Sequence, residues 1–367
     1  SVGRDVVATH TEDFCRSWFG DAQAPEAARL LNRVSTLNGR CTPEMLDAHT
    51  YNLETGEWRQ VADDYMRLEA EALRQYITLA PEQRDANQQL ILFPVQAMGN
   101  IYDMYYAQAM NHKLASVGDP DANLWADRCR QAFKRDSLLC LYYNKVMSGG
   151  KWDGMMIQKH ISYRTWNDNY RADVCPRLVT VAEPKNGPVF SASNGYISIE
   201  AEHTYSREDA SAAKWTVIPF MGRTLSGVAL MPYAEKTDGA KLTYCFKADG
   251  VKMAKVHVVT KSTLDFQDKG GLVYEISIDG QAPVSVNFNK DLNEKPENIY
   301  SKYYPTVASR VVEQVVELPV DTKTGIHHLT IHPQDPGIVF EKIVIDLGGY
   351  HKQFLFGRES PKTYFVQ

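Results

Sequence analysis

Apolar side chains in the first half of the chain recur every three or four residues, which is the period of an α-helix. Between Glu57 and Leu79 the positions that follow this period are Val61, Tyr65, Leu68, Ala72, Tyr76 and Leu79. Pro81 begins the next helix, in which Pro94 predicts a kink, and Asp119 is the predicted N-cap of a later helix. Short loops separate these helices, so residues 1–170 are predicted to form a helical bundle.

After Pro188 the period of the apolar positions changes to two, which is the period of a β-strand with one buried face. Apolar and polar residues alternate between Ile197 and Glu202, and further short strands are predicted at residues 241–246, 254–260, 273–278, 311–318, 328–331 and 339–345. Asp279-Gly280 is a strong hairpin signal. The fold class is therefore a helical bundle followed by an antiparallel β-sandwich of the jelly-roll kind at residues 189–367, with a linker at residues 171–188.

Composition and charge narrow the classes of protein to which the chain can belong. Of its 367 residues, 44% are hydrophobic and 23% are charged, which is typical of a folded globular protein. The net charge of −5 and the lack of a Lys/Arg cluster argue against a nucleic-acid partner. No apolar run reaches the roughly 20 residues that span a bilayer, so no membrane partner is expected. The start at Ser1 without a leader predicts a processed chain or a piece of a longer one.

Cysteine spacing and short motifs give no catalytic or metal centre. The cysteines are scattered, at Cys15, Cys41, Cys129, Cys140, Cys175 and Cys245. No CxxC and no Cys/His pair at metal spacing occurs, so the sequence leaves zinc unsupported and favours buried free thiols. HExxH, GxSxG, P-loop and GxGxxG motifs do not occur either, so no catalytic residue is assigned from a motif.

The stretch GGKWDGMMIQKHISYRTW, residues 149–166, gathers aromatic and cationic side chains between glycines. Its candidate carbohydrate-contact residues are Lys151, Trp152, His160, Tyr163, Arg164 and Trp166. The tryptophan rings can stack on pyranose faces, and the cations can bind a carboxylate. Alternatively, the aromatic and methionine side chains fill a joint between the two domains.

Carboxylates and tyrosines give further candidates. A hydrolase site at the joint would use acids that lie there, and the candidates are Asp153, Asp168 and Asp173. Their spacing gives no reason to pair them. Glu200 and Glu202 share one face of a predicted strand, so they either bind a cation such as Ca²⁺ or belong to an exposed polar face. A later aromatic loop, which contacts a glycan or a partner or else covers the sandwich core, carries Tyr300, Tyr303 and Tyr304.

Short motifs in both halves resemble, in order, the C-terminal half of the glycoside hydrolase family 115 enzymes, the xylan α-1,2-glucuronidases. In the first half they are FCRSWFG (14–20), GRCTPEML (39–46), QLILFPVQA (89–97) and the GGKW, MM and HISY pieces of residues 149–163. In the second half they are NGYISIEAE (194–202), IPFMGRT (218–224) and residues 328–346, which include Asp335-Pro336-Gly337. Together they cover nearly the whole chain.

The resemblance implies an enzyme that is larger than this chain. Such enzymes have an N-terminal α/β domain, a TIM-like barrel, a helical domain and a C-terminal β-sandwich, and they remove 4-O-methyl-glucuronic acid from xylan with inversion. Their catalytic carboxylates lie on the barrel, so the resemblance places no catalytic residue here and leaves open whether the chain alone is an enzyme. It implies a non-catalytic portion that supports the barrel, forms a homodimer, meets glucuronic-acid-bearing carbohydrate from xylan, and works in the periplasm or outside the cell.

The sandwich also resembles the carbohydrate-binding modules of families 6 and 35, through Ile199-Glu200-Ala201-Glu202. In those modules the acidic pair helps to hold a structural Ca²⁺ together with an acid on the last strand. The candidate for that acid is Glu341, where the usual residue is Asp. The resemblance thus implies a possible calcium site at Glu200, Glu202 and Glu341, and no other cofactor is required. A free-standing carbohydrate-binding or scaffolding module is the alternative function.

The same resemblance favours the joint over the ligand site for residues 149–166, since the chemistry of the family lies elsewhere. On that interpretation Trp152 is a buried aromatic residue, and Trp152→Ala lowers the free energy of unfolding by roughly 3–5 kcal/mol.

Overall fold

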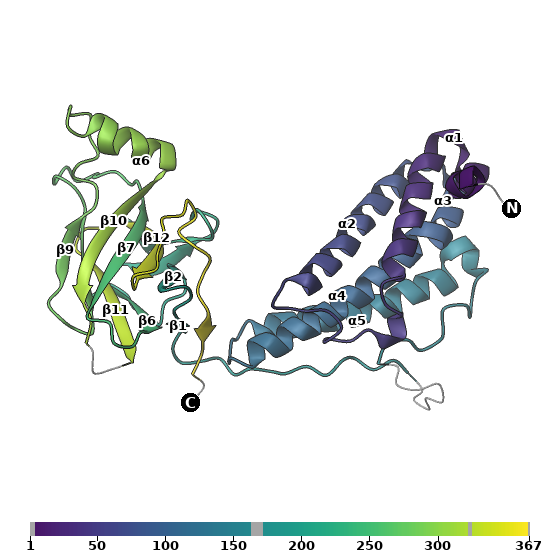
Figure 1. Ribbon diagram of the computed structural model, residues 1–367, viewed down its shortest axis with the longest axis horizontal. Coiled ribbons are helices and arrows are strands. Elements are labelled where there is room, and N and C mark those ends of the chain that lie inside the picture. Colours follow the sequence, from purple (N-terminus) through teal and green to yellow (C-terminus); the bar gives the residue numbers. More distant parts are fainter. Residues whose placement is uncertain (1–3, 163–171, 322–324, 366–367) are drawn as a thin grey trace. The chain divides into compact units, whose positions relative to one another are not determined.

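The computed structural model describes residues 4–162, 172–321 and 325–365 of the chain. They form two compact units, Ser1–Ala182 and Glu183–Gln367 (Figure 1). Each unit has a hydrophobic core of its own. The first unit is helical and the second is built of β-strands, so the predicted fold class is confirmed.

A long connection, residues 39–56, joins the first two α-helices of the first unit, and shorter connections join the others. Its α-helices are α1 (Arg4–Asn38), α2 (Glu57–Thr78), α3 (Pro81–Asn87), α4 (Phe93–Ala115) and α5 (Ala122–Lys145). Its other helical turns are the 3₁₀ turns Pro43–Met45 and Met147–Gly150 and the π turn Gln88–Leu92. Helix α1 changes direction at Gly20, whose φ of 74° is open to glycine without strain.

Aromatic side chains shared by α2 and α4 fill the core of the helical unit. Trp58 and Tyr65 of α2 and Tyr102 of α4 are buried, and the ring centroids of Tyr65 and Tyr102 lie 4.4 Å apart. The indole N–H of Trp58 donates a hydrogen bond of 3.1 Å to the carbonyl of Ala48, so its polar atom is satisfied inside the core. The apolar face predicted for residues 57–79 is therefore the face that packs on α4.

Two details of the helical unit differ from the local sequence signals. Where the sequence predicted a kink at Pro94, a π turn, Gln88–Leu92, precedes α4, and Pro94 lies in the first turn of α4. Asp119 is not the N-cap of α5, since the helix begins at Ala122 after Asp121. Its carboxylate instead accepts a hydrogen bond of 3.0 Å from the backbone N–H of Asp121, which forms a turn ahead of the helix.

The segment after residue 172 is extended and is bound to the helices. Asn111 of α4 donates to the carbonyl and accepts from the N–H of Val179, at 2.8 and 2.9 Å. Asn123 of α5 holds Val181 in the same way, at 2.8 and 3.0 Å. Each asparagine side chain therefore satisfies the backbone N–H and carbonyl of one residue, as a neighbouring strand would. The helical unit accordingly extends to Ala182. No helix in the described part of the chain is long and apolar enough to cross a membrane.

The second unit consists of short strands with one helical excursion. Its strands are β1 (Val189–Ser191), β2 (Tyr196–Glu200), β3 (Ser206–Glu208), β4 (Lys214–Ile218), β5 (Gly227–Met231), β6 (Lys241–Lys247), β7 (Met253–Lys261), β8 (Val273–Ile278), β9 (Val284–Asn287), β10 (Val311–Pro319), β11 (Ile326–Pro333), β12 (Val339–Asp346) and β13 (Lys362–Thr363). Between β9 and β10 lie a π turn (Ile299–Tyr303) and the short helix α6 (Tyr304–Ser309).

These strands form two sheets that enclose one core. One sheet has the order β13-β1-β6-β11-β8-β9, with β3 also paired to β6, and the other has the order β10-β7-β12-β5-β4, with β2 paired to β12. All pairings are antiparallel except β1 with β6, which is parallel. The alternating residues of the long strands β7, β8 and β11 point inward, and this is the period-two pattern of the sequence.

The predicted hairpin at Asp279-Gly280 joins β8 to β9. Both residues have positive φ, 54° and 69°, and the N–H of Gln281 donates to the carbonyl of Ile278 at 3.1 Å. Positive φ at both central positions defines the tight turn that matches the twist of the flanking strands.

Candidate functional site

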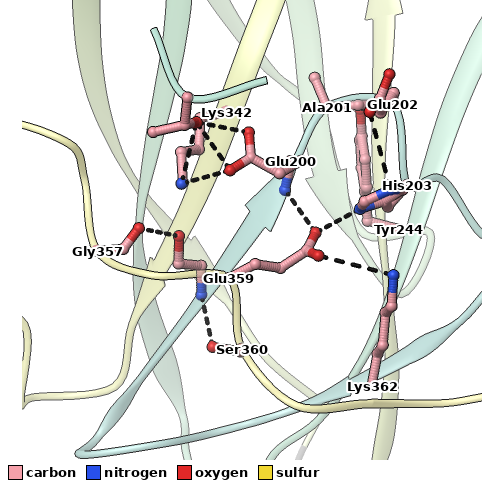
Figure 2. Close-up of polar contacts among 12 residues, drawn as sticks. Glu200, Ala201, Glu202, His203, Tyr244, Lys342, Gly357, Glu359, Ser360 and Lys362 are labelled. Carbon is pink, nitrogen blue, oxygen red and sulfur yellow. Dashed lines mark hydrogen bonds and ion pairs between the residues drawn. The ribbon is translucent and has the colours of Figure 1, made fainter. Parts of the chain in front are cut away.

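Glu200 is a buried carboxylate that an ammonium group of the opposite strand neutralises. Lys342 lies directly across from Glu200 in the antiparallel pair of β2 and β12. Its Nζ atom lies 2.7 Å from Oε1 of Glu200, and only 3% and 9% of the two side chains are exposed (Figure 2). The hydroxyl of Thr224 donates to the same carboxylate. A carboxylate is tolerated inside a protein only with such compensation, so Glu200 depends on Lys342.

Glu341 has a lysine of its own. The register of β12 against β7 shifts between Phe340 and Lys342, so Glu341 lies at a β-bulge, which aims its side chain independently of the strand. Nζ of Lys261 lies 2.9 Å from Oε1 of Glu341 and forms an ion pair with it. The angles between the two groups do not meet the criteria of a hydrogen bond. The backbone N–H of Arg223 donates to Oε2 at 2.8 Å. The Glu341 carboxylate is therefore also compensated within the chain.

A third carboxylate at the end of β2 comes from the C-terminal tail. Glu359 accepts a hydrogen bond of 2.6 Å from Nδ1 of His203 and one of 3.1 Å from the backbone N–H of Glu200 (Figure 2). Nζ of Lys362 lies 3.7 Å away. Burial by itself raises the pKa of Glu359, but the bond from His203 and the nearby charges outweigh it and lower the pKa. Glu202 lies farther from His203 than Glu359 does, since its carboxylate is 3.9 Å from Nε2 of His203.

The same tail is fastened to β2 by hydrogen bonds on either side of Glu359. The backbone N–H of Ser198 donates to the hydroxyl of Ser360, and the N–H of Ser360 donates back to the carbonyl of Ser198, both at 2.9 Å. The hydroxyl of Ser198 donates to the carbonyl of Phe356 at 3.1 Å. Glu359 thus lies in a segment with a fixed backbone, which explains how an acid so far along the chain reaches β2.

The arrangement at β2 does not fit a calcium ion. Ca²⁺ requires six to eight oxygen ligands that converge on one point. Glu200 and Glu341 instead face separate lysines, and Glu202 lies beside a histidine. Within the described ranges of the chain, these three carboxylates do not form a metal-ligand group. The calcium site at Glu200, Glu202 and Glu341 stays a prediction that the geometry does not support.

Of the candidate residues of the stretch 149–166 that the structure describes, Lys151 and Trp152 lie together and His160 lies apart from them. Trp152 is half-buried against Phe93, Tyr143 and Met147, with the exposed Lys151 ammonium 4.8 Å from its ring centroid. Trp152 therefore fills a small core of the helical unit rather than presenting a free ring to a sugar. Three of the candidates lie outside the described residues: Tyr163, Arg164 and Trp166.

His160 contacts α5 at Asp136, whereas Trp152 contacts the same helix at Tyr143. Its Nε2 is 2.9 Å from Oδ1 of Asp136, and its Nδ1 is 2.9 Å from the carbonyl of Gln158. Asp136 and Tyr143 are seven residues apart, or roughly 10 Å along the helix, so His160 and Trp152 do not share a site. The hydrogen bond to Asp136, opposed by burial, raises the pKa of His160 to about 9. Among the predicted acids of the joint, Asp173 accepts from the N–H of His160 at 2.8 Å, and Asp153 pairs with Lys145 at 2.6 Å.

A groove of about 980 Å³ runs along one edge of the sandwich, between β9 and β10. Ser301, Thr306 and Ser309 from the helical excursion line it, together with charged side chains of both signs: Arg223, Lys290, Lys302, Lys352, Asp291, Glu313 and Glu317. Phe354, which is 73% exposed, forms part of its wall and stacks on the guanidinium of Arg223, whose Cζ lies 4.2 Å from the ring centroid. The groove therefore combines many hydrogen-bonding groups with one exposed aromatic face.

The tyrosines of the predicted aromatic loop lie on the excursion that borders this groove. Tyr300 is 78% exposed and Tyr304 is 47% exposed, so neither is a lid buried over the sandwich core. The rings of Tyr300 and Tyr304 lie 5.6 Å apart, and Tyr303 contacts Tyr304 at 5.8 Å. Of the two interpretations of this loop, the exposure of the tyrosines supports contact with a glycan or a partner over a cover of the sandwich core.

The sequence had singled out neither Glu359 nor this groove. Glu359 lies in an irregular segment without hydrophobic period, and only the need for a third acid near Glu200 could have drawn attention to it. The groove forms where the edge strands of two sheets meet, so its lining comes from residues up to 133 positions apart, Arg223 and Phe356.

The second unit is a two-layer β-sandwich whose buried acids are ion-paired. Residues 189–359 match the family model described as the glycosyl hydrolase family 115 C-terminal domain. The sandwich is therefore similar to the C-terminal domain of this glycosyl hydrolase family, and the resemblance seen in the sequence is confirmed for these residues. No curated protein matches the sequence.

Solved structures give the same resemblance at low identity. The chain is similar to a family 115 4-O-methyl-α-glucuronidase, BtGH115A, described as having specificity for decorated arabinogalactans, with 15% identity, a TM-score of 0.33, and coverage of 94% of this chain and 42% of that one. It thus spans less than half the length of that enzyme. The sandwich is similar to a family 6 module of Cellvibrio mixtus lichenase 5A in complex with cellotriose (14% identity, TM-score 0.27, coverage 41% and 95%) and to a family 35 module from Clostridium thermocellum (14%, 0.28, 41% and 97%).

Proposed function

We propose that this chain is the non-catalytic, C-terminal portion of a family 115-type α-glucuronidase, in which it supports a catalytic barrel. The observation that carries this proposal is the match of residues 189–359 to the C-terminal domain of that family. The helical unit would then be the element between the barrel and the sandwich. The substrate of the whole enzyme would be a polysaccharide that bears glucuronic acid, such as glucuronoxylan.

The chemistry of the described residues supports a non-catalytic role. An inverting glycosidase needs two carboxyl groups that face each other across a bond and leave room for water. The buried acids of the sandwich, Glu200 and Glu341, each form an ion pair with a lysine of the chain and are not paired with each other. In the described part of the chain a single strand pair is parallel, whereas a barrel of the TIM type is built from parallel strands throughout.

Homodimerisation and export from the cytoplasm belong to the same proposal and rest on the family resemblance alone. Analytical ultracentrifugation of the chain tests the first. We expect a dimer at micromolar concentration, and a monomer at all concentrations would contradict that part of the proposal without touching the rest.

The direct test of the proposal is an assay of the chain on aldouronic acids. We expect no release of 4-O-methyl-glucuronic acid above the rate of a buffer blank, with a full-length family 115 enzyme as the positive control. Release at a rate similar to that of the full-length enzyme would overturn the proposal, because the chain would then carry its own catalytic acids.

The groove between β9 and β10 favours a second candidate function, a carbohydrate-binding module. A sugar is bound by a flat apolar face together with several hydrogen-bond donors and acceptors, and the groove offers Phe354 beside hydroxyl and charged groups. Calorimetric titration with glucurono-xylo-oligosaccharides tests this function. We expect Phe354→Ala to weaken binding, whereas Phe220→Ala, at an aromatic side chain that is 95% exposed and lies outside the groove, is the matched control. No heat at millimolar ligand would exclude the module.

A further inference from the structure

Asp136, Cys140 and His160 bring one carboxylate, one thiol and one imidazole together in the helical unit. Asp136 and Cys140 are four residues apart on α5, so their side chains lie on one face of the helix. His160 returns to that face from the segment after the helix. One ligand atom from each residue lies within 4.8 Å of the others, and in the described part of the chain no other such group of three or more occurs.

The hydrogen bond of Nδ1 determines which positively charged group the Nε2 atom of His160 can hold. A carbonyl oxygen only accepts, so the 2.9 Å contact from Nδ1 to Gln158 places a hydrogen on Nδ1. Nε2 then faces the carboxylate of Asp136 at 2.9 Å, and a lone pair there would repel it. The position between Nε2 and Asp136 must therefore hold a positive charge, which is either a proton or a metal ion.

The surroundings hold these groups in place. Asp136 is 4% exposed, and the segment that carries His160 is fixed because Oδ1 of Asp173 accepts from the N–H groups of His160 and Ile161, both at 2.8 Å. Asn144, two turns along α5 from Asp136, donates to and accepts from the backbone of Met156, at 2.8 and 2.9 Å. A histidine that gives its other N–H to a backbone carbonyl is the usual outer arrangement of a metal-bound imidazole.

From this geometry we propose that Asp136, Cys140 and Nε2 of His160 bind a Zn²⁺ ion. Thiolate, imidazole and carboxylate are the donors that zinc takes, whereas Ca²⁺ and Mg²⁺ require oxygen ligands. The fourth position of the tetrahedron is open to water, since Cys140 and His160 are only partly buried. Ligand atoms around tetrahedral zinc lie roughly 3.5 Å apart, so a contraction of about 1 Å from the observed 4.8 Å limit completes the site.

The charges balance when the ion enters. Zn²⁺ replaces two protons, one from the Cys140 thiol and one from Nε2 of His160, and both leave to solvent. The net charge of the site is unchanged by the exchange.

Zinc was unsupported in the sequence, because a zinc site is recognised there by the spacing of its ligands along the chain. Here Cys140 and His160 are separated by a helix end and a turn, and only the fold brings them together. The inference does not depend on the proposed function, because it concerns the helical unit by itself.

Zinc titration against a competing chelator, with metal content measured by mass spectrometry, tests the site. We expect the chain to bind one Zn²⁺ ion and Cys140→Ser and Asp136→Asn to weaken binding at least about 10-fold. Cys41→Ser is the matched control, since Cys41 is a half-buried cysteine of the same unit outside the group, and it should bind as the wild type does. Bound Zn²⁺ should also raise the melting temperature of the wild type but not that of Cys140→Ser.

Co²⁺ supplies a readout that does not depend on affinity. A thiolate bound to Co²⁺ gives a charge-transfer absorption in the near ultraviolet, which we expect in the wild type and in Cys41→Ser but not in folded Cys140→Ser. No zinc bound by the wild type would overturn the proposal. Zinc bound equally by the wild type, Cys140→Ser and Asp136→Asn would also overturn it, because the ion would then be held adventitiously elsewhere.

Discussion

Lys342 faces Glu200 across the pair of strands β2 and β12, and the two side chains form an ion pair of 2.7 Å inside the sandwich. This is the strand end at which the sequence suggested a calcium ion. A cation of the chain itself compensates the carboxylate there, so we expect the stability of the sandwich to depend on Lys342.

Lys342→Met is expected to lower the free energy of unfolding by about 3–5 kcal/mol, because it leaves the buried Glu200 carboxylate without a compensating charge. Urea denaturation of the wild type and the variant, followed by circular dichroism, measures the difference. The double variant Glu200→Gln/Lys342→Met should recover most of the loss, since both charges are then removed.

Lys255→Met on the neighbouring strand β7 is the control for this prediction. Lys255 lies 3.7 Å from Glu317, with 58% and 63% of the two side chains exposed, and such surface pairs contribute only about 0–1 kcal/mol. If Lys342→Met cost as little as Lys255→Met, the buried pair would not hold the sandwich together.

Glu313 on β10 makes stability depend on pH in the acid range. His257 donates a hydrogen bond of 2.8 Å to it and Lys352 lies 2.9 Å away, so the pKa of Glu313 is lowered below its ordinary value of 4.5 although burial opposes the change. The folded state therefore binds this proton less tightly than the unfolded state. Its contribution is present above pH 4.5 and is lost as the pH falls through the lowered pKa.

Melting temperatures of the wild type and Glu313→Gln from pH 7 to pH 3 measure this contribution. The variant should melt lower than the wild type at pH 7, and the gap should close as the pH falls. Glu317→Gln, at an exposed position of the same strand, is the matched control and should melt close to the wild type at pH 7. A gap for Glu313→Gln that stayed constant over the whole range would contradict the assignment.

Trp152→Ala is expected to lower the free energy of unfolding by about 1–3 kcal/mol, less than the roughly 3–5 kcal/mol of a fully buried aromatic residue. The structure reduces the expectation drawn from the sequence, because the ring is half-buried against Phe93, Tyr143 and Met147. Trp58→Ala, at a fully buried ring, should cost more, and Trp18→Ala, at a ring that is 54% exposed, should stay within about 0.5 kcal/mol. Equal losses for Trp152→Ala and Trp18→Ala would return Trp152 to the candidates for ligand contact.

The elements of the fold could be predicted because each carries its own local period. The face of residues 57–79 packs on α4, and the alternation at residues 254–260 and 273–278 lies in the core of the sandwich. The hairpin at Asp279-Gly280 followed from backbone chemistry alone. The start of α5 could not be read in this way, since Asp119 and Asp121 are both acceptable caps and only the chain path chooses between them.

The candidate sites were harder to predict, because their chemistry depends on contacts between distant residues. No sequence pattern near Glu200 predicts its contact with Lys342, which lies 142 positions later in the chain. Likewise the sequence placed His160 among the candidates for carbohydrate contact, whereas in the fold it meets Asp136 and Cys140. The residue type indicated that Glu200 was unusual. Only the register of β2 against β12 shows that Lys342 compensates its charge.

The most direct measurement for the account as a whole is the release of 4-O-methyl-glucuronic acid from aldouronic acids by this chain, followed by anion-exchange chromatography over long incubations. If the chain is the non-catalytic portion that we propose, it should give no product above the buffer blank, while a full-length family 115 enzyme releases the uronic acid under the same conditions. Turnover by this chain at the rate of the full-length enzyme would contradict the non-catalytic role and require a catalytic pair within these residues.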